Sequence, residues 1–129
     1  DEAYAVDAID GSGLDRSDKA SCAALVATML TKPGGYDLET MLAVAGETGT
    51  LDDRFLDSPL KGVMRAKTGT LNNVTALVGV ADPSLPRPVR FAFISNGSFT
   101  DPGGKALQDR LVSALATYPE APGADKLRP

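Results

Sequence analysis

The spacing of hydrophobic residues predicts helices at both ends of the chain. Five apolar residues follow Ser17 at intervals of three and four positions and fall on one helical face that Ser17 is placed to cap: Cys22, Leu25, Val26, Met29 and Leu30. A shorter helix is expected at residues 37–45, ahead of Gly46. The same spacing predicts a helix over residues 104–118, with this apolar face: Leu107, Leu111, Ala114, Leu115 and Tyr118.

The middle of the chain has the β-branched, alternating pattern typical of strands. Residues 63–71 and 74–81 are joined by Asn72 and Asn73, a pair that accepts turn geometry, so we expect a hairpin. Residues 89–95 predict a third strand after a connection that contains three prolines. Both faces of the second and third strands are apolar, and both sides of the sheet must therefore be covered.

These elements predict an α+β fold in which helices precede three antiparallel strands and one helix follows them. Because three strands with two apolar faces make a narrow sheet, we expect further strands from another chain or from sequence ahead of Asp1. Without them, residues 1–129 are expected to be insoluble or molten. Residues 119–129 contain three prolines and are expected to form a flexible tail.

Composition excludes several classes of function. The net charge of -4 at pH 7, without a dense basic stripe, argues against a nucleic-acid partner. The chain has no histidine, which excludes Ser-His-Asp, Cys-His and histidine-ligated metal chemistry. No apolar run approaches the roughly 20 residues that span a bilayer. The one cysteine, Cys22, is expected to be buried, as are Met29, Met41 and Met64.

The segment that suggests chemistry is Lys67-Thr68-Gly69-Thr70, inside the first predicted strand. By alternation Thr68 and Thr70 project from one face, which gives two hydroxyl donors for a carboxylate. Lys67 starts from the other face, so it reaches the same ligand only if its stem curls over a sheet edge that borders a cleft. Gly69 suits close approach of a ligand to the backbone. A solvated edge-strand lysine beside a bulge glycine is the alternative interpretation.

The sequence around this segment resembles the third active-site motif of the serine penicillin-recognising enzymes. The similarity runs from Arg65 to Leu71, through the next hydrophobic strand, to a strand that ends at Ser95-Asn96-Gly97. Two upstream segments resemble one branch, the D-alanyl-D-alanine carboxypeptidase/endopeptidases of the penicillin-binding protein 4 type: Asp10-Gly11-Ser12-Gly13-Leu14 and Gly49-Thr50-Leu51 with Arg54-Phe55. The resemblance covers most of residues 7–118.

The resemblance implies the C-terminal part of a penicillin-binding, β-lactamase-like domain at residues 1–118, with three strands of a five-stranded sheet. The family's Ser-x-x-Lys nucleophile motif and its Ser-x-Asn motif are expected to lie in a missing N-terminal part, either a second chain or a preceding segment. One Ser-x-x-Lys string occurs, Ser58-Pro59-Leu60-Lys61, but it lies in a proline-containing connection and we interpret it as coincidental. This chain alone is therefore expected to be inactive.

The activity that the resemblance implies is cleavage of peptidoglycan stem peptides ending in D-Ala-D-Ala, through an acyl-serine and without metal or cofactor, outside the cytoplasmic membrane. β-Lactam antibiotics would acylate the same serine. At matched positions Lys67 and Thr70 would be catalytic, and Thr68, Gly69 and Thr70 would bind substrate. Two alternatives stay open: a non-catalytic module that binds peptidoglycan or a partner through its sheet edge, and a β-lactamase fragment. The Asp10 loop is expected to be structural, with Asp10 bonding its own amides.

Overall fold

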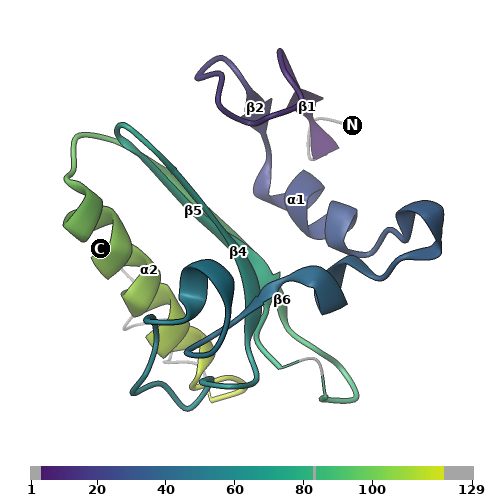
Figure 1. Cartoon of the computed structure of the whole chain (residues 1–129), viewed down its shortest axis with the longest axis vertical. Helices are drawn as coiled ribbons and strands as arrows, with labels where there is room; N and C mark the ends of the chain where they lie inside the picture. The colour runs from purple at the N-terminus through teal and green to yellow at the C-terminus, as the bar shows by residue number, and fades with distance from the viewer. Residues whose placement is uncertain (1–3, 83, 121–129) are drawn as a thin grey trace.

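The central unit is an antiparallel sheet of four strands in the computed structural model, which describes residues 4–82 and 84–120. In sheet order the strands are β3 (Ala43–Val44), β4 (Arg65–Leu71), β5 (Val74–Val80) and β6 (Arg90–Asn96). Helix α2 (Asp101–Leu115) covers one face and helix α1 (Cys22–Met29) packs on the other (Figure 1). The result is a layered α+β fold with the sheet between the two helices.

Shorter elements precede and connect these layers. A separate hairpin of β1 (Val6–Asp7) and β2 (Lys19–Ala20) leads into α1. Three 3-10 turns lie between α1 and β4: η2 (Pro33–Gly35), η3 (Leu38–Met41) and η4 (Gly49–Leu51). η3 is held against the sheet because Arg90 of β6 forms an ion pair with Glu39 of η3.

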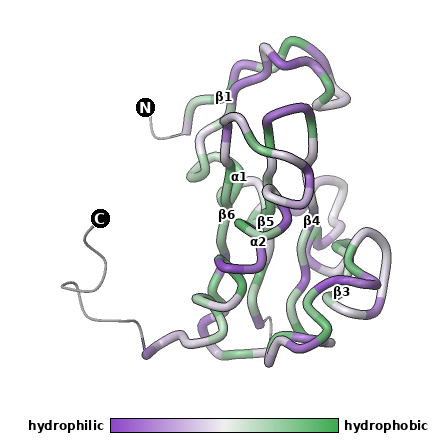
Figure 2. Tube along the Cα trace, turned by 90° about the vertical axis from the view of Figure 1, so that its left-hand side faces the viewer, coloured by the Kyte–Doolittle hydropathy of each residue, from purple (hydrophilic) through white to green (hydrophobic). Residues whose placement is uncertain are grey.

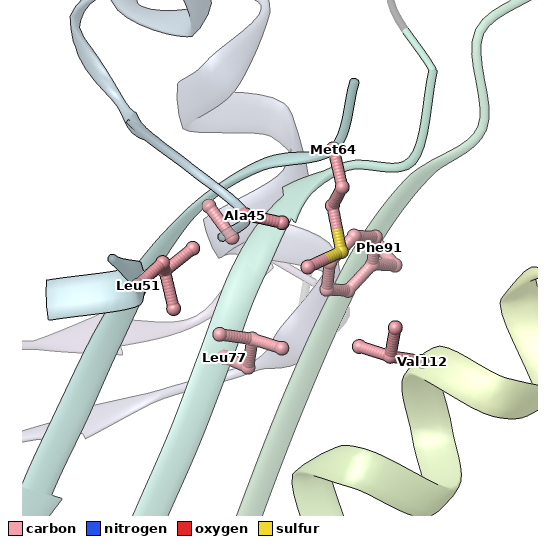
Figure 3. Close-up of a cluster of buried hydrophobic side chains, with 7 residues drawn as sticks. Ala45, Leu51, Met64, Leu77, Phe91 and Val112 are labelled. Carbon is pink, nitrogen blue, oxygen red and sulfur yellow. The ribbon is translucent and has the colours of Figure 1, made fainter. Parts of the chain in front are cut away.

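The hydrophobic core lies between the sheet and α2 (Figure 3). It is formed by seven buried side chains: Ala45, Leu51, Met64, Ala66, Leu77, Phe91 and Val112. The hydropathy trace follows this arrangement, since β5 and β6 are mostly hydrophobic along their length (Figure 2). Burying a side chain such as Leu77 contributes about 1.5–3 kcal/mol, so this cluster is the main source of stability for the fold.

The predicted hairpin and third strand are found near their expected positions, which confirms the α+β fold. β4 and β5 pair from Arg65 opposite Val80 to Leu71 opposite Val74. The turn between them contains Asn73 at φ 61°, in the left-handed region that asparagine tolerates. β6 pairs with the other edge of β5 along seven residues.

The prediction of a helix at residues 37–45 is wrong. Asp37 caps only the single turn η3, where its carboxylate accepts a hydrogen bond from the Glu39 N–H at 3.1 Å. The chain then becomes extended, and Ala43 and Val44 pair with the first two residues of β4. Pairing with a distant strand thus outweighs a helical spacing that rests on a few apolar residues. The strand count of three was too low, because β3 adds a fourth; the five-stranded sheet stays a prediction.

The N-terminal helix begins later than its spacing suggested. Ser21, rather than Ser17, is the N-cap, and its hydroxyl accepts from the Ala24 N–H at 3.1 Å. The helix then runs for eight residues and buries Ala24 and Met29. It contacts β6 and β5, so only part of its apolar face is covered within the described residues.

The C-terminal helix begins and faces the sheet differently from the prediction. Thr100 accepts from the Gly103 N–H at 3.3 Å and is the N-cap, so the helix begins at Asp101, three residues before the expected start. The buried positions are Gly104, Gln108 and Val112. The core therefore meets a helix face rotated from the predicted one, and the assignment of Ala114 and Tyr118 to that face is wrong because both are exposed.

Two further burial predictions are wrong. Cys22 is exposed at the start of α1, and Met41 at the end of η3 is 70% exposed, whereas Met29 and Met64 are buried. Cys22 lines an open hollow between α1 and β6, a surface that the described elements leave uncovered. In the described part of the chain, no helix has the length and apolar character to cross a membrane. Most of the predicted tail, residues 121–129, lies outside the described residues.

Candidate active site

One edge of β4 is open where the Lys67-Thr68-Gly69-Thr70 segment lies. β3 pairs with Arg65 and Ala66 and extends no further. From Lys67 onward, β4 is hydrogen-bonded in the described structure only to β5, on its other side. The segment singled out from the sequence is therefore located on an unpaired strand edge.

The backbone of Thr68 and Thr70 faces this open edge. The Ala45 N–H donates to the Met64 carbonyl at 3.0 Å, which shows that Met64, just ahead of β4, directs its backbone toward the β3 side. Because backbone groups alternate from one side of an antiparallel strand to the other, Thr68 and Thr70 direct their N–H and C=O groups the same way. Within the described residues no strand pairs with these groups, so the Thr68 N–H and the N–H and C=O of Thr70 can pair with a ligand that lies along the strand.

Lys67 bends over the open edge. Its side chain is exposed, and Nζ donates to the Thr68 carbonyl at 2.6 Å. The stem therefore curls from its own face of the strand to the edge, as strand alternation required. Among the described residues the ion pairs involve other cations, so no carboxylate neutralises Lys67. An uncompensated ammonium at this edge attracts an anion.

The two threonine side chains lie on the opposite face of β4 from the start of the Lys67 side chain. Thr68 Oγ1 donates to Thr50 Oγ1 of η4 at 2.9 Å. Thr70 is exposed, and Gly69 between the threonines is half-buried. The structure thus brings the four predicted residues together along one edge and adds the hydroxyl of Thr50 to them.

Arg54 fixes the segment that carries Thr50. Its guanidinium donates to the Asp109 carboxylate at 2.7 Å and to the Gln108 side-chain oxygen at 3.3 Å, both on α2. The Arg54 side chain is only 11% exposed, so these charge-assisted contacts are partly shielded from water. η4 is therefore anchored to α2, and Thr50 is held beside β4.

The Asp10 loop is structural, as expected. The Asp10 carboxylate accepts from the Ser12 and Gly13 N–H groups, each at 2.8 Å, and from the Ser12 hydroxyl at 3.0 Å. These bonds, led by the one from Gly13, hold the pKa of the Asp10 carboxyl below its ordinary value. Arg16 in the same loop donates to the Asn72 carbonyl and so links the loop to the tip of the β4–β5 hairpin.

The Ser58-Pro59-Leu60-Lys61 string lies in the turn-rich connection between η4 and β4. The Ser58 hydroxyl accepts from the Leu60 N–H at 3.1 Å and is part of a local turn. Within the described residues, no group of three or more cysteine, aspartate and glutamate side chains is placed to hold a metal ion.

Comparison with known proteins places this chain in a family. The sequence model of the D-Ala-D-Ala carboxypeptidase 3 (S13) family matches residues 5–118. This chain belongs to that family. The match includes the β4–β5 hairpin and both helices, so the Lys-Thr-Gly segment lies within the shared region.

Two curated relatives are named as carboxypeptidases. A carboxypeptidase of Mycobacterium tuberculosis is 37% identical over 116 residues, which cover 83% of this chain and 25% of that protein. A D-alanyl-D-alanine carboxypeptidase of an Actinomadura species is 34% identical over 117 residues, covering 84% of this chain and 21% of that protein. The S13 chain described here therefore spans about a quarter or less of the length of these relatives.

Two solved structures share the fold. A predatory endopeptidase of Bdellovibrio bacteriovorus, in complex with an immunity protein, matches with a TM-score of 0.69 over 92% of this chain and 34% of that chain. Penicillin-binding protein 4 of Haemophilus influenzae matches with a TM-score of 0.65 over 83% of this chain and 27% of that chain. Both are 24% identical to this chain. They confirm that its fold matches part of the fold of penicillin-binding protein 4.

Sequence reasoning missed the supporting residues of this site. Thr50 and Arg54 were noted only as parts of a resembling segment, and Gln108 was not noted at all. The one signal for Gln108 is its spacing of four residues from Gly104 and from Val112, which places a polar residue in the middle of a helix face that packs on the sheet.

Proposed function

We propose that this chain is the C-terminal part of a serine-type D-alanyl-D-alanine carboxypeptidase/endopeptidase that acts on peptidoglycan outside the cytoplasmic membrane. The observation that carries the proposal is the open edge of β4, where Lys67, Thr68 and Thr70 present a cation, hydroxyls and unpaired backbone groups in a member of the S13 family. The rest of the enzyme, with the nucleophilic serine, is a second chain or a segment that precedes these residues.

The open edge suits a peptide that ends in a carboxylate. A stem peptide ending in D-Ala-D-Ala would lie along β4 as an added strand and pair with the backbone of Thr68 and Thr70. The Lys67 ammonium and the Thr70 hydroxyl would bind its terminal carboxylate through charge-assisted hydrogen bonds, and the Thr68 hydroxyl would join them by turning its proton from Thr50 to the carboxylate. Gly69 leaves the strand bare between the threonines, so substrate can approach the backbone closely. The carboxylate of a β-lactam would occupy the same place.

The proposed reaction is acyl transfer through a serine ester. The serine hydroxyl loses its proton as its oxygen bonds to the carbonyl carbon of the penultimate D-Ala, the peptide C–N bond breaks, and the terminal D-Ala leaves as an amine that takes up that proton. Water then hydrolyses the ester and restores the serine. The Thr70 N–H, on the open edge, would be one of two oxyanion donors, a contribution of about 3–4 kcal/mol in comparable sites. Lys67 would assist the proton transfer.

Intact-protein mass spectrometry after incubation with benzylpenicillin tests the proposal. The complete protein should gain the mass of one penicilloyl group, and residues 1–129 alone should gain none, because neither a Ser-x-Asn motif nor a helix-borne Ser-x-x-Lys motif occurs in them. A stoichiometric adduct on residues 1–129 would contradict the proposal that the nucleophile lies elsewhere. Retention of the complete protein on purified peptidoglycan without any adduct would favour the binding module, and rapid turnover of penicillin would favour a β-lactamase.

A further inference from the structure

A buried glutamine connects α2 to the strand that pairs with the Lys-Thr-Gly segment. Gln108 is 2% exposed, and its Nε2 donates to Thr75 Oγ1 at 2.7 Å and to the Ala76 carbonyl at 3.1 Å. Its Oε1 accepts from Arg54 at 3.3 Å. The orientation of the amide is unambiguous, because a guanidinium only donates and a backbone carbonyl only accepts. Both N–H groups of Nε2 therefore donate hydrogen bonds to β5.

The two residues that Gln108 contacts lie directly opposite the proposed substrate-binding residues. In the register of β4 and β5, Thr75 is the partner of Thr70 and Ala76 is the partner of Gly69. By the alternation described above, Gly69 directs its backbone toward β5, so its N–H and the Gln108 amide meet at the same carbonyl. Gln108 is thus separated from Gly69 by a single backbone group.

The close approach of α2 to β5 is part of the same arrangement. Gly104 lies one helical turn before Gln108, and a Cβ there would be 3.1 Å from the Thr75 Cβ. Without that side chain the helix lies near enough for the Gln108 amide to reach the strand. Val112, one turn after Gln108, packs in the hydrophobic core. The polar contact therefore occurs where α2 passes from the core to the open end of the hairpin.

The buried Gln108 amide is expected to fix the register between α2 and β5 more than it adds to the stability of the fold. Replacing both partners of a buried hydrogen bond with apolar groups of the same shape often changes stability little, whereas a satisfied polar contact favours the one register in which its donors meet their acceptors. We propose that Gln108 is a positioning residue, which holds β5 so that Gly69 and the Thr70 N–H keep the geometry needed for acylation. The inference rests on the proposed function for its kinetic consequence and on the hydrogen bonds alone for its structural one.

The test compares Gln108→Met with the parent in the complete protein, with Ser113→Ala as the control on the exposed side of the same helix. In Gln108→Met the rate constant of acylation by benzylpenicillin should fall at least tenfold, while the dissociation constant of the preceding non-covalent complex should change less than threefold. A general loss of structure would alter both. Hydrogen exchange of the Gly69 amide should accelerate at least tenfold in Gln108→Met and stay at the parent rate in Ser113→Ala.

Hydrogen exchange of Gly69 and the rate of acylation distinguish the positioning role of Gln108 from the proposed function. If the parent is not acylated, the proposed function fails, and faster Gly69 exchange in Gln108→Met still supports the positioning role. Unchanged exchange together with acylation within threefold of the parent would overturn that role. Should Gln108→Met not fold, Thr75→Val removes one acceptor while keeping the shape of the side chain, and the same two measurements on it decide: a tenfold change in both supports the inference, and no change in either refutes it.

Discussion

The two halves of β4 differ in pairing and in exposure although they form one strand. Arg65 and Ala66 pair with a strand on each side, and Ala66 is fully buried in the core. From Lys67 to the end of the strand, pairing continues on one side only, and Lys67 and Thr70 are exposed. The first half stabilises the fold, and the second half presents unpaired backbone beside a cation.

The difference shows how a site with an open edge is made compatible with a stable fold. Unpaired strand edges invite aggregation and contribute less protection against local opening. Here the open half is supported from behind by β5, Gln108 and the Arg54 contacts, and from its tip by Arg16. Four experiments test the buried half, the open half and the segments that flank them.

The largest effect is expected from adding a methyl group beside the buried half. A Cβ on Gly79 would lie 2.2 Å from the Arg65 carbonyl and 2.7 Å from the Ala66 Cβ, so β4 and β5 would have to move apart. Gly79→Ala should lower the free energy of unfolding by about 3 kcal/mol. The matched control is Gly69→Ala, whose Cβ meets only Ala76 at 3.3 Å and which should cost less than about 1 kcal/mol. Equal losses in urea denaturation would contradict the comparison.

The next largest effect is expected on the rate of acylation and not on the stability of the fold. Lys67→Ala in the complete protein should lower the acylation rate by benzylpenicillin at least about 100-fold, a scale typical of a lost charge or proton-transfer group. The melting temperature should hardly change, because the side chain is exposed. Lys61→Ala, in the coincidental Ser-x-x-Lys string, is the control and should acylate at the parent rate. Acylation of Lys67→Ala within threefold of the parent would remove Lys67 from the site.

A smaller effect is expected at the hydroxyl that contacts Thr68. Thr50→Val keeps the shape of the side chain and removes the partner of Thr68 Oγ1, so the Thr68 hydroxyl is no longer oriented. We expect acylation to slow about tenfold, a change of about 1.4 kcal/mol in the activation free energy. Thr50→Ser retains the hydroxyl and should stay within threefold. If valine and serine behave alike in stopped-flow acylation, the hydroxyl contact has no role.

The smallest effect is a pH dependence in the Asp10 loop, which lies between β1 and β2. The pKa of Asp10 is lowered in the folded loop, so the ionised carboxylate stabilises the folded state. This stabilisation is fully present above the unfolded-state pKa near 3.8 and is lost as the pH falls through the lower pKa of the folded state. Acidification through this range should shift the amide resonances of Ser12 and Gly13 in NMR spectra. Asp10→Asn keeps an acceptor but cannot titrate, and an identical acid transition in that variant would assign the change to another group.

Local patterns in the sequence predicted the hairpin of β4 and β5, the third strand and the Lys-Thr-Gly segment. The alternation of side chains and the turn preference of Asn72 and Asn73 act over a few neighbouring residues, and no distant contact overrides them. The same alternation showed that Lys67 needed an open edge to share a ligand with Thr68. The Asp10 loop was predictable for the same reason, since its hydrogen bonds span two or three residues.

Only the tertiary structure decided which residues support that segment. Residues 37–45, expected to be a helix, form the single turn η3 and the strand β3, which pairs with β4. The face of α2 is set by where Gln108 and Val112 meet the sheet. The contact of Thr50 with Thr68 joins residues 18 apart, and that of Gln108 with Thr75 joins residues 33 apart. The sequence by itself determined the strand that carries the candidate site, because that strand follows from local periodicity. Its open edge and its supports depend on chain segments brought together only by packing.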